Sequence, residues 1–388
     1  MYASANSPVP IAGELRAGVG LGGEDAALFM LPFAAGFAAG CLLWFALARH
    51  RSPALLLPMA LALVAAGTLV LVSATGPVAA GAGRFAVGLA SAAFPAATQA
   101  VISHAAPLRL RGRLIGGFAA AVVAGGVLGQ ALVGALADLA SARWALVAVC
   151  AVAPAVTAAA LRAALAGAPA PPPAGAPRAV RALLRRQCPT LAIAALMFGT
   201  YWLVLTQLAA TLRGERFGLS ASEAGLLPAL GIAGVVTTLG GGWWSDRAGH
   251  RVPVAATATL GIVALAVTVP AGAPMWLFAV GVGLFIAAYW GFLAPGASEV
   301  AMRSPGGERQ PAMMAFYAAA WVGAVSFTAL GTVAPGWTTA ALVTIAAWAA
   351  SCAIAATTFH GEPLHPRGAP PPEPPRPAPA PTPGAPPG

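Results

Sequence analysis

Charge is what this sequence lacks most. Only 8% of its 388 residues are charged, whereas a typical soluble domain has about 25%, and 59% are apolar. A soluble chain of this length needs a charged surface, so the composition excludes a water-soluble globular protein. Most of the protein surface must therefore face lipid.

Lysine is absent altogether. All 21 basic residues are arginine, and with 11 acidic residues they give a net charge of +10. Such a charge suggests a nucleic-acid partner in a soluble protein. Here the arginines stand in short segments between apolar runs, which the positive-inside bias of membrane proteins explains. We therefore expect a lipid bilayer as the partner, and no nucleic acid.

Cysteines and catalytic motifs are scarce as well. The four cysteines contain no C-x-x-C pair and lie in or beside apolar runs, as small buried side chains do. The five histidines form no zinc motif, and the sequence has no phosphate-binding loop or nucleophile elbow. The sequence predicts no enzyme, no metal site and no cofactor.

The chain contains apolar runs instead, each about as long as the 20 residues that a membrane-spanning helix needs. There are eleven, near residues 26–48, 53–74, 84–105, 114–137, 144–162, 190–212, 223–244, 252–270, 275–299, 312–333 and 338–359. This pattern predicts an all-α, polytopic helical membrane protein.

Composition divides the chain into five parts. A segment rich in proline and arginine, 163–189, separates five runs (26–162) from six (190–359), and we expect a short surface helix at 179–186 within it. Residues 1–25 precede the first run, and 360–388 form a proline-rich tail that we expect to be disordered. Sixteen arginines fall on the side of the linker and tail and five on the other side, which predicts that the linker and C-terminus are cytoplasmic and residues 1–25 face outward.

The most informative segment is a charged turn between two uncharged apolar runs. Its pattern, G-x-x-x-D-R-x-G-x-R, consists of Gly242, Asp246, Arg247, Gly249 and Arg251. It resembles the loop signature of the major facilitator superfamily of solute transporters. The resemblance implies two six-helix halves that open alternately, with this loop closing the cytoplasmic side. An ordinary charged loop without a gating role is the alternative interpretation.

The two halves differ in register. The charged turn follows the second helix of the second half, whereas the basic turn Arg49-His50-Arg51 follows the first visible helix of the first half. The halves match if one helix of a 12-helix transporter is missing before residue 1, and that is our expectation. A genuine eleven-helix protein is the alternative.

Two further motifs resemble the drug:proton antiporter branch of this superfamily. Gly83-Arg84 and Gly88 match its fourth helix, where the resemblance implies that Arg84 assists proton transfer; an interfacial arginine reaching toward water is the alternative. The antiporter signature of the fifth helix matches Gly116, Gly125 and Gly129, with Gln130 in place of a proline. Such glycines also allow close helix packing in any membrane protein.

Few side chains in the apolar runs carry chemistry. The proton-coupling candidates are Arg84, Asp138 and Glu299, although the two carboxylates also suit helix ends. A substrate cavity needs a few polar and aromatic groups on apolar helices. The candidates are Gln99, Gln130, Tyr201, Trp202, Gln207, Tyr289, Trp290 and Tyr317. Helix packing or contact with the lipid boundary is the alternative role for each of them.

The resemblance implies a monomeric secondary transporter in the plasma membrane, the inner membrane of a bacterium. It would export small drug-like molecules or metabolites by alternating access, in exchange for protons. Two alternatives remain, namely an uptake permease for a sugar or organic solute, and a truncated membrane protein that does not transport.

Overall fold

The computed structural model describes residues 8–9, 11–21, 27–48, 51, 53–95, 111–165, 180–214, 216–219, 223–224, 232–270, 272–304 and 308–359. Regular structure within these ranges is helical, without a strand. In the described part of the chain, nine helical segments are long and apolar enough to cross a bilayer, and Arg251–Ala266 is a shorter apolar helix. The chain is therefore a multi-pass, all-α membrane protein, as its composition predicts.

The first half begins with a short helix, α2 (Ala12–Gly18), and continues with long ones. These are α3 (Ala27–Ala48), α4 (Pro53–Ser73), α5 (Pro77–Ser91) and α7 (Arg111–Leu139). Three consecutive segments complete the half: α8 (Ala142–Leu146), the π-helical η2 (Val147–Val152) and α9 (Ala153–Leu165).

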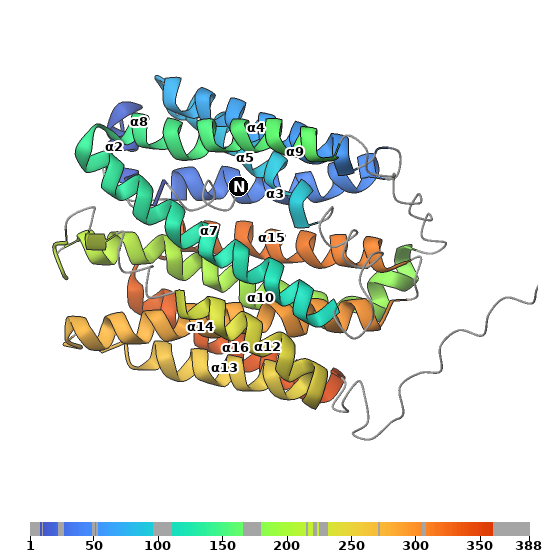
Figure 1. The fold of residues 1–388 in the computed structure, drawn as a ribbon. Coiled ribbons are helices and arrows are strands. Elements are labelled where there is room, and N and C mark those ends of the chain that lie inside the picture. Colours follow the sequence, from blue (N-terminus) through green and yellow to red (C-terminus); the bar gives the residue numbers. More distant parts are fainter. Residues whose placement is uncertain are drawn as a thin grey trace, which may run out of the picture.

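The second half consists of six long helices. They are α10 (Val180–Arg213), α12 (Ala233–Ala248), α13 (Arg251–Ala266), α14 (Met275–Met302), α15 (Arg309–Val333) and α16 (Trp337–Thr358). In Figure 1 α3, α4, α5 and α9 of the first half lie above the second half, and α7 runs diagonally down across it. We call the end of the bundle that carries the α12–α13 turn the turn side, and the opposite end the α2 side.

The starts of two helices, α5 and α10, differ from those predicted. Helix α5 begins at Pro77 and not at residue 84, because Gly76 and Pro77 form a suitable helix start before an Ala/Gly-rich apolar stretch. Helix α10 begins at Val180, so the surface helix expected at 179–186 is instead its first two turns, and the helix continues through Pro189. At 34 residues α10 is about 51 Å long, more than the roughly 30 Å of a hydrocarbon core.

The charged turn is also shorter than predicted. Helix α12 extends to Ala248 and α13 begins at Arg251, so Asp246 and Arg247 form the last helical turn and only two residues connect the helices. Gly249 has a φ of 72°, a left-handed conformation that a residue without a Cβ adopts at no steric cost. This glycine makes the sharp reversal possible.

The two halves repeat one packing pattern. In the first half α5 packs against both α3 and α4, and α4 packs against η2 and α9. In the second half α14 packs in the same way against α12 and α13, and α13 packs against α16. In this repeat α3 of the first half is therefore equivalent to α12 of the second half. Among the described residues, no helix of the first half takes the place that α10 occupies beside α15 and α16.

Contacts inside each half are made by backbone against backbone. A Cβ added at Gly199 of α10 would lie 2.6 Å from the carbonyl oxygen of Gly323 in α15. A Cβ added at Gly323 would lie closer still to the carbonyl oxygen of Ala195. In the first half, Gly88 of α5 lies against the backbone of Phe33 in α3. Glycine permits this approach because helices in a membrane associate through close packing.

Two main helix pairs connect the described parts of the halves, α3 with α15 and α7 with α12, and α7 also contacts α14. In the second pair a Cβ at Gly116 would lie 3.4 Å from the carbonyl oxygen of Thr238, which is ordinary van der Waals contact. The halves therefore meet less tightly here than the helices meet inside each half.

Candidate functional site

Aromatic rings from both halves meet at the middle of the bundle. Phe37 of α3 stacks on Trp321 of α15, with ring centroids 4.1 Å apart, and Phe33 stacks on Trp202 of α10 at 5.9 Å. Phe198 of α10 adds an edge-on contact to Trp321 at 4.7 Å. We call Phe33, Phe37, Phe198, Trp202 and Trp321 the central aromatic cluster. Four of its five side chains, those other than Phe198, are at most 3% exposed.

A second group of rings lies entirely inside the second half. Tyr201 stacks on Tyr289 with centroids 3.8 Å apart and an interplanar angle of 10°, and Trp290 stands edge-on to both. Phe198 connects this group to the central aromatic cluster through Tyr289, at 5.7 Å. The predicted cavity residues Tyr201, Trp202, Tyr289 and Trp290 are therefore brought together, but in this state their faces are covered by other rings.

Arg84 reaches the cluster from the first half. Its Nε donates a hydrogen bond to the carbonyl oxygen of Phe29 at 3.1 Å, and its guanidinium lies over the ring of Phe33, 4.7 Å from the centroid. The residue is 1% exposed and falls in the middle of the membrane-spanning segment Pro77–Pro95. This placement argues against the interfacial interpretation of Arg84, which assumed that the helix begins there. A buried cation at this depth is costly and is usually functional.

Glu299 belongs to a different site, on the turn side. Its Oε2 lies 2.7 Å from Nδ1 of His250, and its Oε1 accepts a hydrogen bond from Nε of Arg303 at 2.7 Å. Arg303 also donates to the carbonyl oxygen of Thr358 at the end of α16. His250 and Glu299 are fully buried. We call His250, Glu299 and Arg303 the turn network, because they tie the α12–α13 turn to the ends of α14 and α16.

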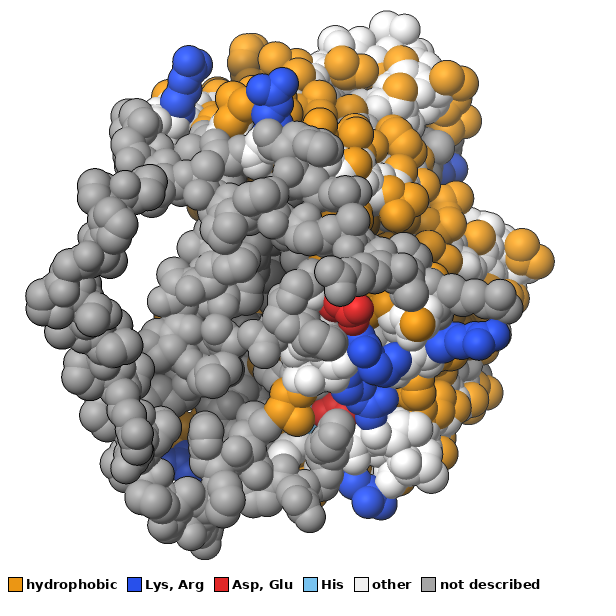
Figure 2. Space-filling model, turned by 90° about the vertical axis from the view of Figure 1, so that its right-hand side faces the viewer, with side chains coloured by type: hydrophobic (Ala, Val, Ile, Leu, Met, Phe, Trp, Pro, Cys, Tyr) orange, Lys and Arg blue, Asp and Glu red, His pale blue; other side chains and the backbone are white. Residues whose placement is uncertain are grey.

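The motif residues around this turn have different surroundings. Gly242 is buried in α12, whereas Arg247 and Arg251 are exposed. The guanidinium of Arg247 lies 3.6 Å from the ring centroid of Trp243. The side chain of Asp246 is outside the described part of the chain. Figure 2 looks onto the turn side and shows arginine side chains (blue) spread over it, with few carboxylates (red) between them.

The glycine helix α7 packs against α12 and, less extensively, against α14 of the second half. Gly116 contacts α12, whereas a Cβ at Gly125 would meet no atom within 4 Å. Gly129 and Gln130 are buried, and Asp138 is exposed near the end of the helix on the α2 side. The structure therefore places Asp138 away from both Arg84 and the turn network.

Two other predicted cavity residues, Gln207 and Tyr317, make contacts outside the ring groups described above, and Gln99 is outside the described residues. Gln207 joins α10 to the α15–α16 turn, because its Nε2 donates to the carbonyl oxygen of Gly331 at 3.2 Å and its Oε1 accepts from the amide of Gly336 at 3.0 Å. Tyr317 is buried one helical turn from Trp321 and contacts the ring of Phe316.

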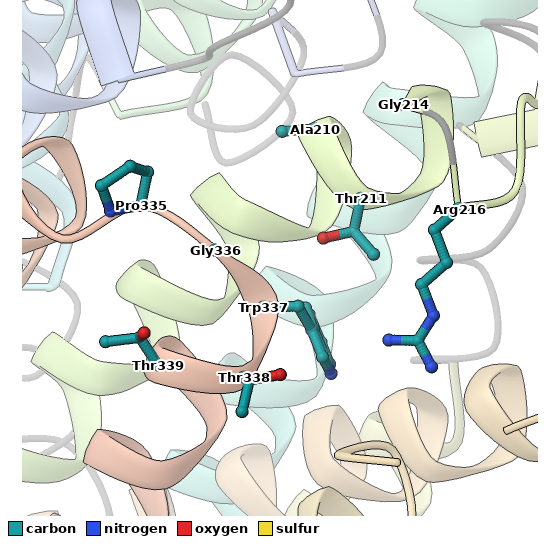
Figure 3. Close-up of a pocket in the computed structure, with 9 residues that line it drawn as sticks. All are labelled: Ala210, Thr211, Gly214, Arg216, Pro335, Gly336, Trp337, Thr338 and Thr339. Atoms are coloured by element: carbon teal, nitrogen blue, oxygen red, sulfur yellow. The ribbon is translucent and has the colours of Figure 1, made fainter. Parts of the chain in front are cut away.

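A hollow of about 680 Å³ lies on the α2 side, between the end of α10 and the start of α16. Figure 3 shows Thr211, Arg216, Trp337 and Thr339 around it. Arg216 already donates to the carbonyl oxygen of Pro270 at 2.9 Å, and its guanidinium lies about 5 Å from the ring of Phe278. This arginine therefore fixes a loop, and the hollow is remote from the central aromatic cluster.

The phenylalanines of the cluster and the partners of Glu299 are not among the site residues predicted from the sequence. Phe29, Phe33 and Phe37 recur every four residues, which places them on one face of α3, and this spacing is a signal that the sequence does contain. Arg303 follows Glu299 by one helical turn. His250 lies 49 residues from Glu299, and nothing in the sequence pairs them.

Two repeated halves of membrane-spanning helices, with aromatic side chains and a buried arginine between them, define a polytopic protein built around an interface. The chain belongs to the Major Facilitator Superfamily, whose family model matches residues 1–329. It is thus a membrane transporter and not an enzyme. No curated protein matches its sequence.

Solved structures share the fold at low sequence identity. A bacterial homologue of the iron transporter ferroportin in the outward-facing state is 16% identical, with a TM-score of 0.68 over 91% of this chain and 95% of that one. The human organic anion transporter MFSD10 is 14% identical, with a TM-score of 0.69 over 92% and 96%. The proton:xylose symporter XylE is 13% identical, with a TM-score of 0.67 over 91% and 92%. These similarities establish the fold alone.

Proposed function

We propose that this protein is a secondary active transporter that exports small molecules by alternating access, in exchange for protons. The difference between tight packing inside each half and looser packing between the halves carries this proposal. Helices fixed backbone to backbone move as one body, whereas side-chain contacts between bodies can separate. The halves would therefore rock about the central aromatic cluster.

The turn network supports the proposed gating role of the turn. It attaches the α12–α13 turn to α14 and α16 of the same half, so the turn would move with that half. Gly116 and Thr238 bring α7 and α12 together between the halves. In the proposed cycle this contact closes the turn side, which the distribution of arginines predicts to be cytoplasmic.

Arg84 is the proposed proton-coupling residue. It is the one coupling candidate that lies beside the central aromatic cluster, whereas Glu299 is bound in the turn network and Asp138 is exposed. A proton arriving near Arg84 would change the charge balance where the halves meet. We further propose a monomer in the plasma membrane, the inner membrane of a bacterium, with a cytoplasmic C-terminus.

Everted membrane vesicles test export and coupling together. Respiration acidifies the vesicle interior, and quinacrine fluorescence reports the proton gradient while one dye of each charge is added: ethidium, Nile red or fluorescein. We expect at least one dye to accumulate and to release quinacrine quenching, and a protonophore to abolish accumulation. The Gly117→Ala variant is the matched control and is expected to behave as the wild type, since this glycine lies outside the signature and the added methyl meets no neighbour.

Other outcomes would contradict the proposal in specific ways. Accumulation that survives the protonophore would remove proton coupling. Flux in the opposite direction would identify an uptake permease. Protein that is correctly folded in the membrane, yet moves none of the dyes and none of a wider solute panel, would favour a non-transporting membrane protein.

A further inference from the structure

The ring stacks in and beside the central aromatic cluster are of two kinds. The Tyr201–Tyr289 stack joins α10 and α14 of one half, so it would survive a movement of the halves. The Phe37–Trp321 and Phe33–Trp202 stacks join α3 of the first half to helices of the second. These two stacks must break whenever the halves separate at this level.

Separation would uncover the ring faces of Trp202 and Trp321. Both indoles are at most 3% exposed in this structure, and Phe33 and Phe37 of the first half lie against them. Aromatic rings prefer offset-stacked or edge-on neighbours, and a flat ring system restores such contacts better than an aliphatic group does. An aromatic solute is therefore the ligand that best replaces the lost stacks.

The charges around the cluster select among aromatic solutes. Arg84 lies 4.7 Å from the ring centroid of Phe33 and brings a buried positive charge to this level. In a medium of low dielectric constant, this cation favours an anionic ligand over a cationic one.

We infer that the site between the halves accepts a flat aromatic anion, held by the faces of Trp202 and Trp321 and oriented by Arg84. This inference rests on the proposed function, because it assumes that the halves separate to admit a solute. The ring occupies the place of Phe33 and Phe37 against the two tryptophans. The negative group points toward the first half.

Binding to the purified full-length protein tests this inference without any transport assay. Equilibrium dialysis compares 2-naphthoate with three analogues that change one property each: neutral 2-naphthalenemethanol, cationic 2-naphthylmethylamine and the saturated decalin-2-carboxylate. We expect 2-naphthoate to bind about tenfold more tightly than the cation and the saturated acid, with the alcohol in between. Equal affinities for the naphthoate and the saturated acid, or a preference for the cation, would overturn the inference.

Variants separate the two determinants. Trp321→Leu is expected to lower 2-naphthoate affinity about tenfold, whereas Trp348→Leu, a matched buried tryptophan inside the second half, is expected to leave it unchanged. Arg84→Gln is expected to abolish the preference for the anion over the alcohol, and Arg84→Lys to retain it. Gel filtration and the melting temperature check that each variant is folded, and the wild-type ligand series decides the question if a variant is not.

The inference and the proposed function can fail separately. Binding of 2-naphthoate to a protein that transports no solute would support the site and remove the proposed transport. Transport of dyes in everted vesicles, without binding of 2-naphthoate or inhibition by it, would support the transport and overturn the aromatic anion.

Discussion

Contacts within the halves and contacts between them use different chemistry. Inside each half, glycines such as Gly88, Gly199 and Gly323 let helix backbones touch, and a single methyl group at these positions would clash. Between the halves, Gly116 leaves room for a methyl, and the stack of Phe37 on Trp321 is made by side chains. A contact between backbones cannot slide, whereas a contact between side chains can be exchanged for another. This difference is what the proposed rocking of the two halves requires.

The largest expected effect comes from breaking the turn network inside the second half. Glu299→Ala leaves Arg303 and the buried His250 without the carboxylate that joins them, and removing one partner of a buried pair costs about 3–5 kcal/mol. We expect a large fall in the melting temperature of the detergent-solubilised protein. Glu308→Ala removes a partly exposed ion pair with Arg186 and is the control, with an expected cost of about 0–1 kcal/mol. Equal shifts for the two variants would refute the structural role of the network.

The next effect tests the backbone contacts within a half directly. Gly323→Ala drives a methyl into the backbone of Ala195, and overpacking of this kind costs about 1–3 kcal/mol. The same change at Gly125 meets no neighbour and, since alanine is the better helix former, is expected to stabilise α7 by up to about 1 kcal/mol. Thermal unfolding of the two variants in parallel measures the difference. A destabilised Gly125→Ala with an unaffected Gly323→Ala would reverse the comparison.

The sequence predicts the membrane-spanning helices well, because apolar length is a local property. Each of the eleven predicted runs overlaps a described helix, and the boundary errors fall where other chemistry decides, as at Pro77 and Val180. The site is less predictable. Tyr201 and Tyr289 stand out as polar aromatics in apolar runs, but their stack depends on how α10 and α14 pack, and that packing joins residues 88 positions apart.

A change between the halves is expected to alter conformation more than stability. Gly116→Ala fits the 3.4 Å space beside Thr238, whereas Gly116→Leu would hold α7 away from α12. An overpacking cost of about 1–3 kcal/mol, applied only to the state in which these helices touch, shifts the populations of the states roughly tenfold. A single cysteine at Thr238, in a background without the native cysteines, reports this shift as faster labelling by a polar maleimide. Unchanged labelling in Gly116→Leu would show that this contact does not close the turn side.

The smallest effect is expected at the surface connection between the halves on the α2 side. Glu14 of α2 lies 3.6 Å from Arg213 at the end of α10, and the Glu14 side chain is 45% exposed. An exposed pair of this kind is worth about 0–1 kcal/mol, so Glu14→Gln is expected to leave the melting temperature nearly unchanged.

The same pair nevertheless spans the interface between the halves, where a small energy acts on the balance of states and not on folding. A cysteine introduced at Thr211, beside the hollow at the end of α10, reports this balance through its rate of maleimide labelling. At low salt we expect labelling to be up to a few-fold faster in Glu14→Gln than with Glu14 intact. At high salt the difference should disappear, because screening weakens the ion pair in the wild type. A large loss of stability in this variant would mean that the two halves are held together as firmly as each half is held within itself.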